Sequence, residues 1–103
     1  MFGEIYICRF PFTDGTTSKV RPVLALFDLG EDVVICRITS MTRSSPCDVT
    51  LMDWQAAGLL KPSIARLNRL VTVERSLLKH RLGSLSVGDA TAVRTAWNRH
   101  LKL

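Results

Sequence analysis

Short runs of apolar and β-branched residues, separated by turn-forming residues, occupy the first two-thirds of this 103-residue chain. In a β-strand, side chains at every second position share one face. Runs of this composition and length therefore predict a series of β-strands. The predicted strands cover residues 4–10, 20–27, 33–39, 48–52, 63–67 and 69–74. The third of them, VVICRIT, is β-branched and apolar on both faces, which indicates a central strand.

The period changes towards the C-terminus. Ser86, with Asp89 three residues later, forms a pattern like a capping box at the start of a helix. Apolar residues then recur at spacings of three and four and predict one buried helix face: Val87, Ala90, Val93, Trp97 and Leu101. Residues 53–58 predict a short helical turn. Many short strands and one terminal helix predict a single domain, residues 1–103, built as a small β-barrel.

Charge and cysteine content narrow the class of protein. The chain carries 14 lysines and arginines against 9 acidic residues, a formal net charge of +5, which favours polyanionic partners such as nucleic acid. Cys8, Cys36 and Cys47 show no C-x-x-C spacing and have no histidine nearby, so neither a disulfide framework nor a metal site is expected. The expected compartment is a reducing cytoplasm, because the cysteines indicate no disulfide framework and no apolar run reaches membrane-spanning length.

A polar loop followed by an arginine is the first candidate site. Hydroxyl groups and cations together suit a phosphodiester, since arginine offers a bidentate fork to phosphate oxygens. Pro22 restricts Arg21 to extended geometry, so its guanidinium projects from a defined backbone. A surface ion pair of Arg21 with Glu4 or Asp14 fits the spacing equally well. The candidate residues are Thr13, Asp14, Thr16, Thr17, Ser18, Lys19 and Arg21.

Two further segments offer similar chemistry. Thr39 and Ser40 end a predicted strand and are followed by Arg43, while Arg66 and Asn68 share one side of a later strand. The second pair fits a binding surface or a plain exposed strand face equally well.

One reaction that such residues could perform on a phosphodiester is the cleavage of RNA without a metal ion. This reaction needs groups that carry protons as well as a cation. His80 and His100 are not paired in any register, and both are expected at the surface or at a helix end. Trp54 and Trp97 are expected in the core rather than stacked on a base.

The motifs GEIYICRFPFTDGTTSKVRPVLAL, VVICRITS and DWQAAGLLKPSIARLNRLVTVERSLL together resemble the PemK/MazF-like toxins of type II toxin–antitoxin systems, over nearly the whole chain. The resemblance implies the CcdB/MazF-like toxin fold, a small SH3-like β-barrel with a C-terminal helix, assembled as a homodimer. It also implies a growth-regulating endoribonuclease that cleaves single-stranded mRNA at specific sequences without metal or cofactor. The expected products carry a 2′,3′-cyclic phosphate and a 5′-hydroxyl. A cognate antitoxin with an acidic tail would silence the enzyme, and the complex of the two would bind DNA.

The resemblance also implies roles for individual residues. Arg21 matches the arginine that stabilises the phosphorane, Thr39 matches the threonine that works beside it, and Ser40 flanks them. Arg66 lies where plasmid-borne relatives carry another catalytic arginine, whereas Asn68 replaces their aspartate. Thr16 stands where some relatives carry histidine or glutamate. The implied RNA-binding residues are Thr13, Asp14, Thr16, Thr17, Lys19, Arg43, Arg66 and Asn68.

Two other functions remain open at this point. A non-catalytic toxin of the same fold would bind a protein target such as DNA gyrase through its C-terminal helix, where Trp97 lies. A degenerate nuclease would survive as a module that binds RNA or an antitoxin, a possibility raised by Asn68, because asparagine cannot act as a general base.

Overall fold

The computed structural model describes residues 1–11 and 18–103, which form six strands, one short 3-10 helix and one α-helix. In chain order these elements are β1 (Glu4–Pro11), β2 (Ser18–Asp28), β3 (Asp32–Thr39), β4 (Asp48–Leu51), β5 (Ser63–Glu74), η1 (Arg75–Leu77), β6 (Leu78–Ser84) and α1 (Val87–His100). The paired strands are antiparallel, in the order β4-β5-β3-β2-β1-β6. The prediction of a mostly-β fold with a C-terminal helix is confirmed.

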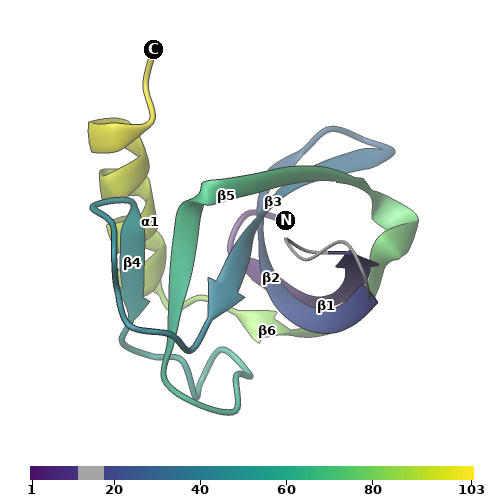
Figure 1. Cartoon of the computed structure of the whole chain (residues 1–103), viewed down its shortest axis with the longest axis horizontal. Helices are drawn as coiled ribbons and strands as arrows, with labels where there is room; N and C mark the ends of the chain where they lie inside the picture. Colours follow the sequence, from purple (N-terminus) through teal and green to yellow (C-terminus); the bar gives the residue numbers. More distant parts are fainter. Residues whose placement is uncertain (12–17) are drawn as a thin grey trace.

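The sheet curls into the wall of a small barrel, and α1 lies beside β4 on its outside (Figure 1). The strand order ends at β4 on one side and at β6 on the other. Over the described ranges these two end strands do not pair with each other, so the curled sheet is open between them.

Alternate residues of β2 and β3 supply hydrophobic clusters on opposite faces of the sheet. Leu24 and Ile38 pack with Val93 of α1 on one face. Val23 and Ile35 pack on the other face. All five side chains are buried. The segment VVICRIT therefore forms a central strand covered on both faces, as its composition predicted.

A bulge in β5 replaces the predicted break near Asn68. The sequence predicted two strands, 63–67 and 69–74, but β5 is one strand of 12 residues. Cys36 of β3 pairs with Leu70, whereas the next residue, Arg37, pairs with Arg66. Three residues of β5 therefore bulge out between these two pairs, and such a bulge bends a strand without ending it.

The predicted cap of the terminal helix is confirmed, because the Ser86 hydroxyl accepts a hydrogen bond from the backbone N–H of Asp89 at 3.1 Å. The Asp89 carboxylate does not take part in this cap. It is buried and accepts hydrogen bonds from the backbone N–H groups of Met52 (3.0 Å) and Asp53 (2.9 Å), which ties α1 to the turn after β4. Val87 is 86% exposed, so its predicted place on the buried face is wrong.

Two glycines allow the turn after β4 to touch β6. Gly58 has φ of +91°, and a Cβ there would lie 2.3 Å from the carbonyl oxygen of Leu82. A Cβ on Gly83 would lie 2.4 Å from the carbonyl oxygen of Ala57. No side chain fits at either position. Gly58 ends the helical turn, as predicted. The close approach of this turn to β6 forms one wall of the pocket described below.

The described cysteines are free thiols, with Cys8 and Cys36 fully buried and Cys47 half-buried. Burial raises the pKa of the Cys8 and Cys36 thiols, which keeps them protonated and unreactive. The predicted role of these two as small core residues is confirmed. None of the helices described here is long and apolar enough to span a membrane.

Candidate functional site

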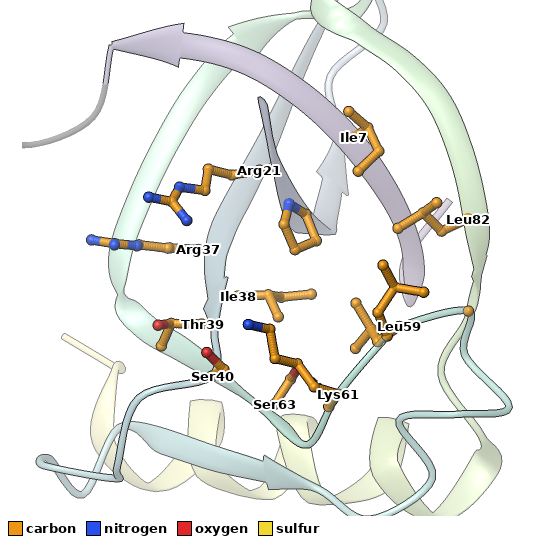
Figure 2. A pocket seen from close by; sticks show the side chains of 13 residues that line it. Ile7, Arg21, Arg37, Ile38, Thr39, Ser40, Leu59, Lys61, Ser63 and Leu82 are labelled. Atoms are coloured by element: carbon orange, nitrogen blue, oxygen red, sulfur yellow. The ribbon is translucent and has the colours of Figure 1, made fainter. Parts of the chain in front are cut away.

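A pocket of about 200 Å³ lies where β2 and β3 meet the turn that precedes β5 (Figure 2). Its apolar wall includes Ile7, Leu59 and Leu82. Its polar side chains are Arg21, Arg37, Thr39, Ser40, Lys61 and Ser63. Cations and hydroxyl groups therefore gather around one hollow whose remaining wall is hydrophobic, an arrangement suited to an anionic group attached to a ring with an apolar face.

Arg21 lies on β2 opposite Cys8 of β1, and its side chain is partly buried at the pocket. Its Nε atom is buried and has no hydrogen-bond acceptor among the residues described. Glu4, a possible ion-pair partner of Arg21 from the sequence, instead forms a salt bridge with Arg81 (2.9 Å) and accepts a hydrogen bond from the Tyr6 hydroxyl (3.1 Å). The guanidinium is therefore not neutralised by Glu4.

Thr39 and Ser40 lie beside the arginines, as the motif ITS predicted. The Thr39 hydroxyl oxygen accepts a hydrogen bond from the backbone N–H of Met41 at 3.2 Å. That bond fixes the oxygen and leaves its O–H group to donate towards the pocket. Ser40 is exposed at the rim. The structure thus brings together the three residues expected to be catalytic.

Arg37 and Lys61 also line this pocket, and the sequence did not single them out. Arg37 shares a face of β3 with Thr39, two residues away. Burial lowers the pKa of Arg37, and the positive charges of Arg21, Arg66 and Arg69 lower it further. An arginine inside the otherwise apolar run VVICRIT was the available signal, because an apolar central strand rarely holds a charge without a function or a partner.

Arg66 is engaged in a structural ion pair. Its guanidinium contacts the Asp48 carboxylate at 2.9 Å and donates to the Ser44 hydroxyl at 2.9 Å. Asp48 is fully buried and also accepts a hydrogen bond from the backbone N–H of Ser44 at 2.8 Å. This network holds the segment between β3 and β4 against β5, and Arg66 does not line the described wall of the pocket.

The other residues expected to bind RNA lie elsewhere or are not described. Arg43 is exposed in a separate hollow with Arg99 and His100 of α1. Asn68 is exposed on the bulge of β5. Lys19 belongs to β2, where it pairs with Phe10 of β1, and its expected role in RNA binding stays a prediction. Thr13, Asp14, Thr16 and Thr17 lie outside the described residues, so their expected role stays a prediction.

The histidines and tryptophans occupy the positions that the sequence predicted. His80 is exposed on β6, opposite Ile7, and His100 is exposed in the last turn of α1. Trp97 packs edge-on against Phe27, with ring centroids 5.2 Å apart, and both Trp54 and Trp97 contact the core. None of these four side chains lines the pocket with Arg21.

The sequence from residue 1 to residue 101 matches the model of a protein family described as the PemK-like, MazF-like toxins of type II toxin–antitoxin systems. The chain belongs to this family. The match spans almost the entire length of this PemK/MazF-like protein and confirms the resemblance seen in its motifs. No curated protein sequence matches it significantly.

Solved structures share the fold of this PemK/MazF-like protein. An endoribonuclease from a Mycobacterial species, in complex with its cognate antitoxin, aligns with a TM-score of 0.79 and 19% identity over 98% of this chain and 93% of the other. The Mycobacterium tuberculosis toxin MazF-mt6 aligns with a TM-score of 0.76 and 24% identity over 93% of each chain. The structure of MazE-MazF from Deinococcus radiodurans aligns with a TM-score of 0.74 and 19% identity, over 96% of this chain and 92% of the other.

Proposed function

We propose that this protein is a sequence-specific endoribonuclease toxin that cleaves single-stranded RNA without a metal ion. The observation that carries this proposal is the convergence of Arg21, Arg37 and the Thr39 hydroxyl on one pocket in a member of a toxin family. A pocket with guanidinium and hydroxyl donors can hold a phosphodiester and stabilise extra negative charge on it.

The proposed reaction is an internal transfer at phosphorus. The 2′-oxygen of the ribose loses its proton and bonds to the adjacent phosphorus, the bond from phosphorus to the 5′-oxygen breaks, and that oxygen gains a proton. The products are a 2′,3′-cyclic phosphate and a 5′-hydroxyl. Arg21 supplies charge and donors to the phosphorane oxygens, where negative charge develops, and the Thr39 hydroxyl donates beside it.

The direct test incubates the purified protein with a long single-stranded RNA in excess EDTA and maps the new ends. We expect cuts at a short recurring sequence, with 5′ ends that polynucleotide kinase labels without prior phosphatase treatment. Cleavage that EDTA abolishes, or labelling that needs phosphatase, would contradict the proposed chemistry. Tight RNA binding without any cut would indicate a degenerate binding module, and gyrase trapping with intact RNA would indicate a toxin that targets a protein.

We also propose that the protein acts in the cytoplasm as a homodimer and is silenced by an antitoxin with an acidic segment. Two of the structural relatives were solved as complexes, one with its cognate antitoxin and one as MazE-MazF. The net charge of +5 and the cations of the pocket make this chain a suitable partner for carboxylates.

Binding of the antitoxin should weaken as salt rises, because ions screen the attraction between its carboxylates and the exposed cations. Between roughly 50 and 500 mM salt, we expect the dissociation constant to rise by about tenfold or more. Titration calorimetry at several salt concentrations measures this change. A complex whose affinity stays constant over that range would show that apolar contacts, rather than charge, dominate the interface.

A further inference from the structure

We propose that Arg37 is a second phosphate-binding arginine, so that the pocket holds one phosphodiester between two guanidinium groups from neighbouring strands. The inference rests on the proposed endoribonuclease function. It adds to that function a residue that neither the motifs of the sequence nor the family match singles out.

The sheet register places the two arginines close together. Arg37 of β3 pairs with Val23 of β2, and Arg21 lies two residues before Val23 on the same face of β2. Two positions along an antiparallel pair separate such side chains by a distance that two long arginines can span. Figure 2 shows both side chains extending in the same direction on one side of the pocket, above Thr39.

The charges at this place favour an anion. Arg37 is half-buried and lies within the fields of Arg21, Arg66 and Arg69, and the partial burial and these charges together lower its pKa. Two guanidinium groups brought close together destabilise each other, and a phosphodiester between them converts that repulsion into two attractions. Its two non-bridging oxygens can each accept hydrogen bonds from one guanidinium.

The nearby Arg66 does not serve this purpose in the structure. Its charge is balanced by the buried Asp48 carboxylate at 2.9 Å, and it lies outside the described pocket lining. Arg21, in contrast, has a buried Nε–H group without an acceptor in the part of the chain that is described. A phosphate oxygen placed between Arg21 and Arg37 would satisfy that donor.

The first test uses inorganic phosphate and needs no catalysis. In the 15N-labelled protein, titration with phosphate should shift the side-chain Nε–H resonances of both Arg21 and Arg37. It should leave in place that of Arg75, whose Nε–H already donates to the carbonyl oxygen of Gly30. A shift at Arg21 alone would overturn the inference, because a shared phosphate must contact both groups.

The second test uses an RNA with 2′-O-methyl riboses, which carries its phosphates but cannot react. We expect Arg37→Gln to weaken binding about tenfold and to reduce the slope of log affinity against log salt by about 0.7, the value for one lost phosphate contact with a single strand. Arg37→Lys should keep the slope and lose only part of the affinity, because it retains the charge but not the fork. Arg75→Gln is the control, because Arg75 is exposed, pairs with Asp28 and does not line the pocket, and it should leave the affinity and the slope unchanged.

The outcomes separate this inference from the proposed function. If the wild-type protein cleaves RNA while Arg37→Gln keeps the wild-type slope and affinity, the inference fails and the function stands. If phosphate shifts both arginine signals while no RNA is cleaved, the arginine pair stands and the endoribonuclease function fails. A purely structural role for Arg37 would instead lower the thermal stability of Arg37→Gln and leave the salt slope intact.

Discussion

Arg21→Ala is expected to slow RNA cleavage by a factor of about 100 to 1,000, since removal of one preorganised donor to a developing oxyanion typically costs that much. The guanidinium stabilises the phosphorane more than the substrate, because only the phosphorane carries the extra charge. The loss should therefore appear mainly in kcat. Single-turnover cleavage of a short RNA that contains the mapped site measures it.

The same substitution should not destabilise the protein. Arg21 lies beside Arg37, whose pKa is lowered partly by the charge of Arg21, so removing that charge relieves a repulsion. We expect the free energy of unfolding to stay equal or to rise by up to about 1 kcal/mol. A substitution that lowers activity without lowering stability indicates that the charge serves function rather than the fold. Urea denaturation of Arg21→Ala measures the change in the free energy of unfolding.

Two further variants calibrate the result. Thr39→Ala removes one neutral hydrogen bond and should slow cleavage by only about tenfold. Arg21→Lys keeps a charge without the bidentate fork and should fall between alanine and the wild type. If Arg21→Ala cleaves RNA at the wild-type rate, Arg21 is not the residue that stabilises the phosphorane, and the roles assigned to the pocket must be revised.

Strands β1 to β4 and the terminal helix could be predicted because local patterns determine them, whereas the sequence predicted no strand at β6. Alternation along β1 to β4, the Ser86 cap and the spacing within α1 depend on neighbours that are close in sequence. The failures occur where distant parts meet. Asn68 looks like a break in a strand, but β5 continues through it as a bulge because β3 provides a partner on both sides. Val87 has the correct helical spacing, yet no element covers it.

Half of the polar side chains of the pocket could be predicted for a different reason. Arg21, Thr39 and Ser40 were expected there from the resemblance of the motifs to a known family. Arg37 and Lys61 lie in the same stretches of sequence, but the resemblance implied no role for them. They reach the pocket through the register of β2 with β3 and through the turn that Gly58 ends. Sequence could show that Arg37 is unusual in its strand, but only the register shows that it lies beside Arg21.

The pair of Asp48 and Arg66 could not be predicted from sequence at all. In the sequence, Asp48 is only the polar first residue of a predicted strand. Arg66 lies 18 positions later, in a different predicted strand. They meet because β4 and β5 pair with these two residues directly opposite each other. Arg66, for which the resemblance implied a catalytic role, is therefore paired with a buried carboxylate in this chain.

Asp48→Ala is expected to lower the free energy of unfolding by about 3–5 kcal/mol, the usual cost of removing one partner from a buried ion pair. The Asp48 side chain is fully buried and that of Arg66 is 13% exposed, so water cannot replace the lost carboxylate. The backbone N–H of Ser44 also loses its acceptor. Urea denaturation measures the loss, and Asp32→Asn, which removes the same charge from an exposed position, should change stability by less than about 0.5 kcal/mol.

A double-mutant cycle separates the ion pair from simple loss of packing. Arg66→Met leaves the Asp48 charge buried alone and should also destabilise the protein by several kcal/mol, about as much as Asp48→Ala. The double variant, Asp48→Ala with Arg66→Met, buries no unpaired charge, so it should be more stable than either single variant. If the losses of the single variants instead add in the double variant, the two side chains stabilise the fold independently. The segment between β3 and β4 would then not depend on their contact.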